Sequence, residues 1–142
     1  MMRCRKASDS DIGWLGEMNH QLIADERHSN PMDVAQLQER MRGWLLGEYI
    51  ALVFEDDTGP VGYALLKEES DRVYLRQFFI VRHRRRQGLG RAAMEHLFSY
   101  VVPLKRKVVL DVLTHNQAAI QFYQALGFTP YCLTMQRVPL PS

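Results

Sequence analysis

Long apolar runs, clustered cysteines and a strong net charge are all missing from this sequence. No stretch approaches the roughly 20 apolar residues of a membrane-spanning helix. The opening residues, Met1 to Lys6, lack the apolar core of a secretory leader. Eighteen basic and sixteen acidic residues leave a formal charge of +2, so no general field attracts nucleic acid. We therefore expect neither a membrane nor a nucleic-acid partner.

Only two cysteines are present, Cys4 and Cys132, and neither has a metal-binding or redox spacing. We expect no metal site and a reduced, cytoplasmic setting. Two common nucleotide motifs, G-x-x-x-x-G-K-S/T and G-x-G-x-x-G, are also absent. The 142 residues, 46% hydrophobic and 24% charged, have the size and composition of one globular unit. We expect a single domain over residues 1–142.

The most informative stretch is Arg85-Arg86-Gln87-Gly88-Leu89-Gly90. It follows the apolar run 78–81 and opens an amphipathic run over 91–102, an order that indicates a strand, a glycine turn and a helix. Free N–H groups and the positive dipole end at a helix start favour phosphate or pyrophosphate there. Further arginines surround it, at 82, 84 and 91. The alternative is a plain helix start with a solvated basic face.

A second motif begins at Asn116 and reads N-x-x-A-x-x-x-Y-x-x-x-G-F through Ala119, Tyr123, Gly127 and Phe128. Together with the R/Q-x-x-G-x-G/A loop at 85–90, it resembles the GNAT superfamily of acetyl-CoA-dependent N-acetyltransferases. Both motifs stand in that family's order and at its usual separation, and the resemblance covers about residues 49–128.

The periodicities agree with an α/β (α+β) fold of this kind, with about four helices flanking a mixed sheet. The resemblance implies a mostly antiparallel sheet of six to seven strands, whose fourth and fifth strands splay apart to admit the cofactor's pantetheine arm. The expected strands are 3–7, 49–55, 61–67, 73–81, 107–113 and 131–138, and the helices follow Ser8, Asn30-Pro31, Gly88 and Asn116. The splayed pair is then 73–81 and 107–113.

The resemblance also implies a role for each motif residue. Backbone groups of Phe78, Phe79 and Ile80 should bind the pantetheine amides as an added strand would. Asn116 should contact the cofactor arm or cap its own helix, and Tyr123 should lie near the thioester sulfur or pack in the core. The pyrophosphate should be held by the loop residues Arg85, Arg86, Gln87, Gly88, Leu89, Gly90 and Arg91.

The implied chemistry is direct attack of an amine on the thioester, with a tetrahedral intermediate. Tyr123 would donate a hydrogen bond, then a proton, to the departing thiolate. The fourth strand offers Arg76 and Gln77 and no acid, so Asp111 is the candidate base, or it merely orders a turn. Asp25, Glu26 and His28 lie where the family binds its acceptor; they would attract a cationic amine or form a polar loop.

We expect an acetyl-CoA-dependent N-acetyltransferase that acts on a small-molecule amine. A protein N-terminus or lysine side chain is the related alternative, and a non-catalytic acyl-CoA-binding module on the same fold is another. The basic run Arg82 to Arg86 also leaves a minor RNA-binding interpretation, which the near-neutral charge disfavours. A homodimer, with pairing through the last strand, is possible.

Overall fold

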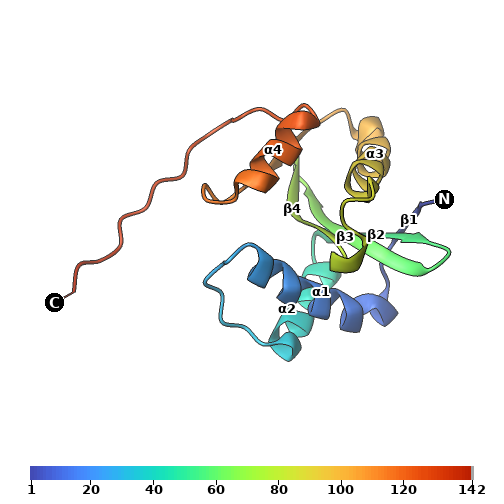
Figure 1. Cartoon of the computed structure of the whole chain (residues 1–142), viewed down its shortest axis with the longest axis horizontal. Helices are drawn as coiled ribbons and strands as arrows, with labels where there is room; N and C mark the ends of the chain where they lie inside the picture. Colours follow the sequence, from blue (N-terminus) through green and yellow to red (C-terminus); the bar gives the residue numbers. More distant parts are fainter. Residues whose placement is uncertain (142) are drawn as a thin grey trace.

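A five-stranded sheet forms the centre of the molecule, with its strands in sequence order from β1 to β5. A computed structural model describes residues 1–141 (Figure 1). The strands are β1 (Arg3–Lys6), β2 (Tyr49–Asp56), β3 (Gly59–Glu68), β4 (Arg72–Ile80) and β5 (Lys107–Leu110). β1 to β4 pair antiparallel, and β5 joins β4 in parallel. The predicted mixed α/β architecture is confirmed, whereas the predicted count of six to seven strands is too high.

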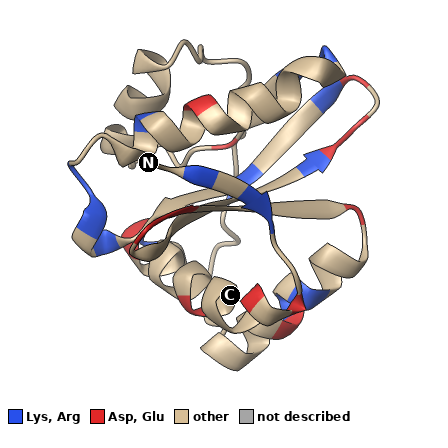
Figure 2. Ribbon diagram, turned by 90° about the vertical axis from the view of Figure 1, so that its right-hand side faces the viewer, with Lys and Arg blue, Asp and Glu red and all other residues tan. Residues whose placement is uncertain are grey.

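Four helices cover the two faces of this sheet (Figure 2). They are α1 (Ile12–Asp25), α2 (Val34–Leu46), α3 (Leu89–Val101) and α4 (Gln117–Ala125), with short 3-10 turns at Asp9–Asp11, Arg82–Arg84 and Val102–Leu104. One core joins Leu15 and Met41 of α1 and α2 to Tyr63 and Phe79 of the sheet. The other core buries Met94 and further α3 residues against the opposite face. The sheet therefore separates two hydrophobic cores, one on each face.

The N-terminal helix starts as the sequence predicts, whereas the second helix does not. Ser8 and Asp11 form a capping box ahead of α1. The expected start of the second helix at Asn30-Pro31 is wrong, because Asp33 caps α2 and accepts from the Gln36 backbone N–H at 2.8 Å. Asn30 instead accepts from the Met32 N–H within the preceding loop. Two polar caps lie close together here, and the one followed by the amphipathic run starts the helix.

β4 carries an irregularity where it parts from β5. Leu65 of β3 pairs with Gln77 and Leu66 pairs with Leu75, so Arg76 is an extra residue on the β4 side. Pairing with β5 ends at Leu75 opposite Leu110, and residues 76–80 of β4 continue without a β5 partner. A bulge bends its strand and re-aims side chains. The predicted splay between these two strands is therefore present.

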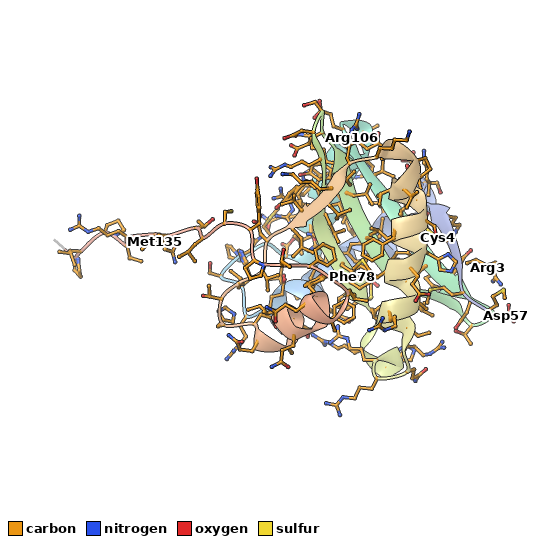
Figure 3. All side chains as sticks on the ribbon, turned by 90° about the horizontal axis from the view of Figure 1, so that it is seen from above. Arg3, Cys4, Asp57, Phe78, Arg106 and Met135 are labelled. Atoms are coloured by element: carbon orange, nitrogen blue, oxygen red, sulfur yellow. The ribbon has the colours of Figure 1, made fainter. Side chains whose placement is uncertain are left out.

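The segment after α4 departs from the prediction. Residues 131–138 were expected to form a last strand, but within residues 1–141 no strand follows β5. The segment 129–141, termed the arm below, runs away from the domain (Figures 1 and 3, where Met135 is labelled). Its large apolar side chains are exposed, Met135 by 84%. β5 is also shorter than the expected 107–113. Apolar alternation is typical of a strand, but a strand also needs hydrogen bonds to a neighbouring strand, and the arm pairs with none within residues 1–141.

Among residues 1–141, no helix is both long enough and apolar enough to span a bilayer. Within the same residues, no three His, Cys, Asp or Glu side chains lie close enough together to hold a metal ion.

Candidate active site

A cavity of about 670 Å³ opens where β4 and β5 separate. Pockets of this size hold small molecules and cofactors. It reaches from the glycine loop before α3, past β4, to the end of α1. Its lining includes Arg76, Gln77, Phe78, Phe79, Ile80, Arg85, Arg86, Gly88, Gly90, Arg91, Asp111, Asn116, Ala119, Phe122, Tyr123, Asp25 and Glu26. The structure thus brings together both motifs that the sequence separates by 26 residues.

The glycine loop forms one end of the cavity. Arg86 and Gly88 adopt left-handed backbone angles, with φ of 62° and 74°. Gly88 is the N-cap of α3 and supplies no side-chain acceptor, so the first-turn N–H groups have no cap. Successive backbone N–H groups in such a turn form an anion-binding concavity. Of the predicted loop residues, Gln87 and Leu89 are not among the cavity-lining side chains, and Gln87 instead accepts from Arg84 Nε at 3.0 Å.

Phe78 lines the cavity and lies between α3 and α4 (Figure 3). Its ring stacks on Phe122 of α4, with centroids 6.0 Å apart. A Cβ added at Gly90 would lie 3.2 Å from the Phe122 ring, so this position has room only for glycine unless the ring moves. On β4, the Ile80 carbonyl already accepts from Arg85 Nε at 2.9 Å. That oxygen therefore already has one hydrogen-bond donor.

Tyr123 lies on α4 and lines the cavity, as the motif predicts. Its ring packs edge-on against Phe122 and Phe128, with centroids 5.2 and 5.5 Å away. Burial, with a smaller contribution from the Glu26 charge, raises the pKa of Tyr123 well above 10. The phenol is neutral at physiological pH and is a hydrogen-bond donor.

Asn116 also lines the cavity, directly before α4. Its side-chain oxygen accepts from the Ala119 backbone N–H at 3.2 Å. This is the helix-cap role that the sequence left open for it. The amide nitrogen of the same side chain is a separate donor group.

Glu26 and Asp111 are two acids at the far end of the cavity. Asp111 follows β5 directly, is exposed and accepts from the Tyr74 hydroxyl at 2.8 Å. Glu26 follows α1 and is half-buried, and burial raises the pKa of its carboxyl above the ordinary value of 4.5. The backbone carbonyl of Glu26 lies 2.8 Å from His115 Nε2, which ties the α1 end to the loop before α4.

Asp25 and His28, predicted beside Glu26 as acceptor-binding residues, have other partners. Asp25 lines the cavity but pairs with Arg82 at 2.8 Å and Arg85 at 2.7 Å. Burial opposes ionisation, yet the hydrogen bonds from Arg85 and Arg82 outweigh it and lower the pKa of Asp25. Its charge is thus already balanced. His28 accepts from the Asn30 N–H and is not among the cavity-lining residues.

Sequence reasoning missed the part of the site that the β4 bulge creates. Arg76 donates to the Tyr49 hydroxyl at 3.3 Å and stacks on Trp44, its guanidinium carbon 4.7 Å from the ring centroid. Gln77, the next residue, accepts from Tyr63 at 2.8 Å. Both contacts lie on the α1–α2 face of the sheet. The sequence contained a signal for this part of the site, because Arg76 and Gln77 are polar residues inside an otherwise apolar strand. The period-2 alternation of a regular strand, however, assigns two consecutive residues to opposite faces of the sheet.

Solved structures of the same fold cover nearly the whole chain. A variant of the BH1408 protein from Bacillus halodurans superposes with a TM-score of 0.81 at 22% identity, over 97% of this chain and 99% of that one. A protein described as a predicted acetyltransferase from Clostridium acetobutylicum, solved with acetyl-CoA, has a TM-score of 0.74 at 16% identity, over 97% and 96%. These likenesses establish the fold.

Two sequence relatives are more than 30% identical over shorter segments. The probable spermine N(1)-acetyltransferase of Bacillus subtilis subsp. natto (strain BEST195) is 31% identical over 87 residues, which is 56% of this chain and 57% of that protein. The peptidyl-lysine N-acetyltransferase YiaC of Escherichia coli (strain K12) is 34% identical over 76 residues, which is 54% and 47%. The chain therefore matches about half the length of each relative.

A sequence model of the Acetyltransferase (GNAT) family matches residues 17–128, well over half of the chain. The matched region contains the glycine loop, the β4–β5 splay and the motif with Asn116 and Tyr123. Geometry and sequence therefore agree, and the chain belongs to the GNAT family of acetyltransferases.

Proposed function

We propose that residues 1–142 form one acetyltransferase domain that moves the acetyl group of acetyl-CoA to a primary amine. The single observation that carries this proposal is the end of β4–β5 pairing at Leu75 and Leu110, beside a cavity that is lined by a basic glycine loop and a half-buried tyrosine. A solved structure of the same fold contains acetyl-CoA, which supports this cofactor. Arg85, Arg86, Arg91 and the first-turn N–H groups of α3 would hold its pyrophosphate.

In the cavity, residues 77–80 of β4 pair with β3 on one side and have no β5 partner on the other. Backbone N–H groups on the open side are suited to bind the pantetheine amides and the thioester oxygen, with Ile80 nearest the loop. The Ile80 carbonyl is taken by Arg85, so we assign the pantetheine acceptor to the carbonyls before it.

The reaction is direct transfer. The amine nitrogen bonds to the thioester carbon, the oxygen takes the negative charge, and the C–S bond then breaks. Tyr123 would donate to the departing thiolate, because its phenol is neutral and lines the cavity. The thiolate ends with that proton or with one from water, and a carboxylate takes the proton that the amine loses.

We assign the base role to Glu26. It is half-buried, its charge acts on Tyr123, and its raised pKa makes it a better base than an ordinary carboxylate. Asp111, the base predicted from the sequence, is exposed and already accepts from Tyr74. Asp111 is the second candidate, since it lines the same cavity.

The acceptor class that we propose is a small-molecule amine, with a peptide amine as the alternative. One relative is named for spermine and the other for peptidyl lysine, so the comparisons support primary amines of both kinds. The protein should be incubated with acetyl-CoA and a panel of small amines and lysine peptides while released thiol is followed. Thiol release that depends on the amine supports the proposal. Tight acetyl-CoA binding without thiol release from any amine would indicate a binding module instead.

We also propose that the chain forms a homodimer by exchange of the arm. Tyr131, Leu133 and Met135 alternate on one face of the arm and are exposed. β5 is an edge strand, and such edges accept another strand. The arm leaves the domain beside this edge, because Lys107 of β5 lies 3.3 Å from the Tyr131 hydroxyl. If two copies exchange arms, the arm of each copy pairs with the β5 edge of the other, and the contact is symmetric.

A further inference from the structure

Two arginines share one aromatic ring, and one of them, Arg76, also lines the cavity. Arg76 of β4 and Arg40 of α2 have their guanidinium carbons 4.7 and 4.4 Å from the Trp44 ring centroid. Arg76 also lies over Tyr49, at 5.8 Å, and donates to its hydroxyl. These contacts hold the Arg76 side chain in one place. An unconstrained surface arginine would sample many rotamers in water.

Neither guanidinium has a carboxylate partner. Among residues 1–141, no Asp or Glu oxygen lies within 4.0 Å of Arg76 or Arg40, although nine such pairs exist elsewhere. Arg40 donates to the neutral amide of Asn19 at 3.0 Å, and its Nε is buried without an acceptor. Desolvation, followed by the nearby Arg76 charge, lowers the pKa of Arg40. Two cations therefore lie on one ring with no carboxylate beside them; Arg76 is exposed to water, and a ligand anion at this place would gain from both charges.

Arg76 is among the residues that line the cavity, although its guanidinium lies over Trp44 and Tyr49, which do not line it. It is the extra residue of the β4 bulge, at the point where β5 leaves β4. Gln77 beside it lines the same cavity, as do Glu26 and Asp111. The cavity lining thus includes carboxylates that suit an ammonium and an arginine that suits an anion. Arginine pairs with carboxylate or phosphate through parallel N–H bonds.

We infer that the acceptor carries an anionic group, a carboxylate in the first instance, that binds Arg76 while its amine lies by Glu26. This inference rests on the proposed function and narrows it to amines with an acidic group, such as amino acids. A polyamine is disfavoured, because its second ammonium would face Arg76. In this respect the chain differs from the relative that is named for spermine.

The test compares acceptors that differ by one carboxylate: tyrosine with tyramine, tryptophan with tryptamine, and lysine with cadaverine. The readout is the ratio of kcat/KM within each pair, measured for the wild type, Arg76→Gln and Arg76→Lys. We expect the wild type to favour at least one carboxylated member. Arg76→Gln should lower that ratio about 10- to 100-fold with little effect on the carboxylate-free amine. Arg76→Lys should restore part of it.

Arg42→Gln is the matched control, since Arg42 is exposed on α2 and pairs with Glu39. It should leave every ratio unchanged. If Arg76 only stabilises the fold through Trp44, Arg76→Gln will lower the melting temperature and both rates together, and the inference is then wrong. A wild type that prefers each carboxylate-free amine also overturns it.

A binding measurement covers the case in which none of these amines is turned over. With CoA present in excess, the indole N–H signal of Trp44 is followed by NMR during titration with N-acetylglycine. We expect a saturable shift in the wild type that is lost in Arg76→Gln, and no shift with the uncharged N-methylacetamide. Absence of the shift in the wild type counts against an anion site. Failure of acetyl transfer to every amine would instead count against the proposed function.

Discussion

Leu75 and Leu110 are the last residues to pair across β4 and β5. Beyond this pair, β4 continues through residues 76–80 beside the cavity, while β5 has ended. The bulge at Arg76 lies directly after Leu75, so the irregularity in the β3–β4 pairing coincides with the point where β4 and β5 separate. The N–H and C=O groups of β4 that would bond to β5 in a regular sheet are therefore available to a ligand.

Tyr123→Phe tests the donor role of the phenol. Because Tyr123 would act on the departing thiolate and not on the pyrophosphate, kcat should fall by about 10²-fold or more. The acetyl-CoA affinity measured by calorimetry should stay nearly constant. Tyr100→Phe is the control, since Tyr100 lies on α3 outside the cavity lining. Normal turnover combined with a large loss of affinity would refute the assigned role.

The pH dependence of kcat/KM separates the two candidate bases. A base must be ionised to act, so activity should fall as the pH drops through its pKa in the free enzyme. Burial raises the pKa of Glu26, which places this acid limb above 4.5. We expect Glu26→Gln to lower the plateau about 10²-fold and abolish that limb. Asp111→Asn should keep the limb. The reverse pattern would assign the base to Asp111.

Gly90→Ala should weaken acetyl-CoA binding by displacing Phe122. The added Cβ would lie 3.2 and 3.3 Å from two atoms of this ring, which stacks on Phe78 in the cavity. Overpacking of this kind costs about 1–3 kcal/mol. Gly43→Ala is the control: no atom lies within 4 Å, and α2 should gain about 0.5–1 kcal/mol from the better helix former. Calorimetry measures the acetyl-CoA affinity, and urea unfolding measures the stability of each variant. Equal acetyl-CoA affinities in Gly90→Ala and Gly43→Ala would contradict the packing argument.

Asp11 should contribute to stability in a pH-dependent way. Arg5 donates two hydrogen bonds to its carboxylate, at 2.9 and 3.0 Å, and lowers the pKa of Asp11 below 3.8. A lowered pKa stabilises the fold above pH 3.8, and this contribution is lost as the pH falls through the lower native value. Asp11→Asn should cost about 1–3 kcal/mol at pH 7 and less in acid. Asp57→Asn, at an exposed pair with Arg3, should cost under about 1 kcal/mol.

Leu133→Asp tests the arm-exchanged dimer. In the wild type we expect light scattering to give twice the 16.5 kDa chain mass. A charge on the apolar face of the arm should shift the protein to a monomer, whereas Thr134→Asp on the opposite face should not. Hydrogen exchange adds a second readout, because arm amides should lose protection on dilution together with the dimer. A protected arm in a monomer would mean that it folds back on its own β5, and a dimer that survives Leu133→Asp would mean another interface.

Much of the site was predictable because it depends on local sequence. Near neighbours in the chain set the geometry of three site positions: Gly88 at a left-handed turn, Asn116 at a helix cap, and Tyr123 seven residues after Asn116 on the same helix. The family inferred from these two motifs is confirmed by the match over residues 17–128. The four helices and the first five strands are likewise present, with small changes at their ends.

Other features depend on residues far apart in the chain, and no local pattern contains them. For Asp25 the sequence left two interpretations, attraction of an amine or a polar loop, and neither includes its pairing with Arg82 and Arg85, some sixty positions away. Arg76 and Gln77 reach the same face only because β4 has one extra residue, Arg76, that pairs with no residue of β3. The spacing and composition of the sequence determine local structure, that is, the positions of the helices, the turns and the motif residues. Packing between distant segments decides which charges pair, where β4 and β5 separate and whether the apolar arm pairs with a strand edge. The interaction energies between such segments exist only once the chain is folded.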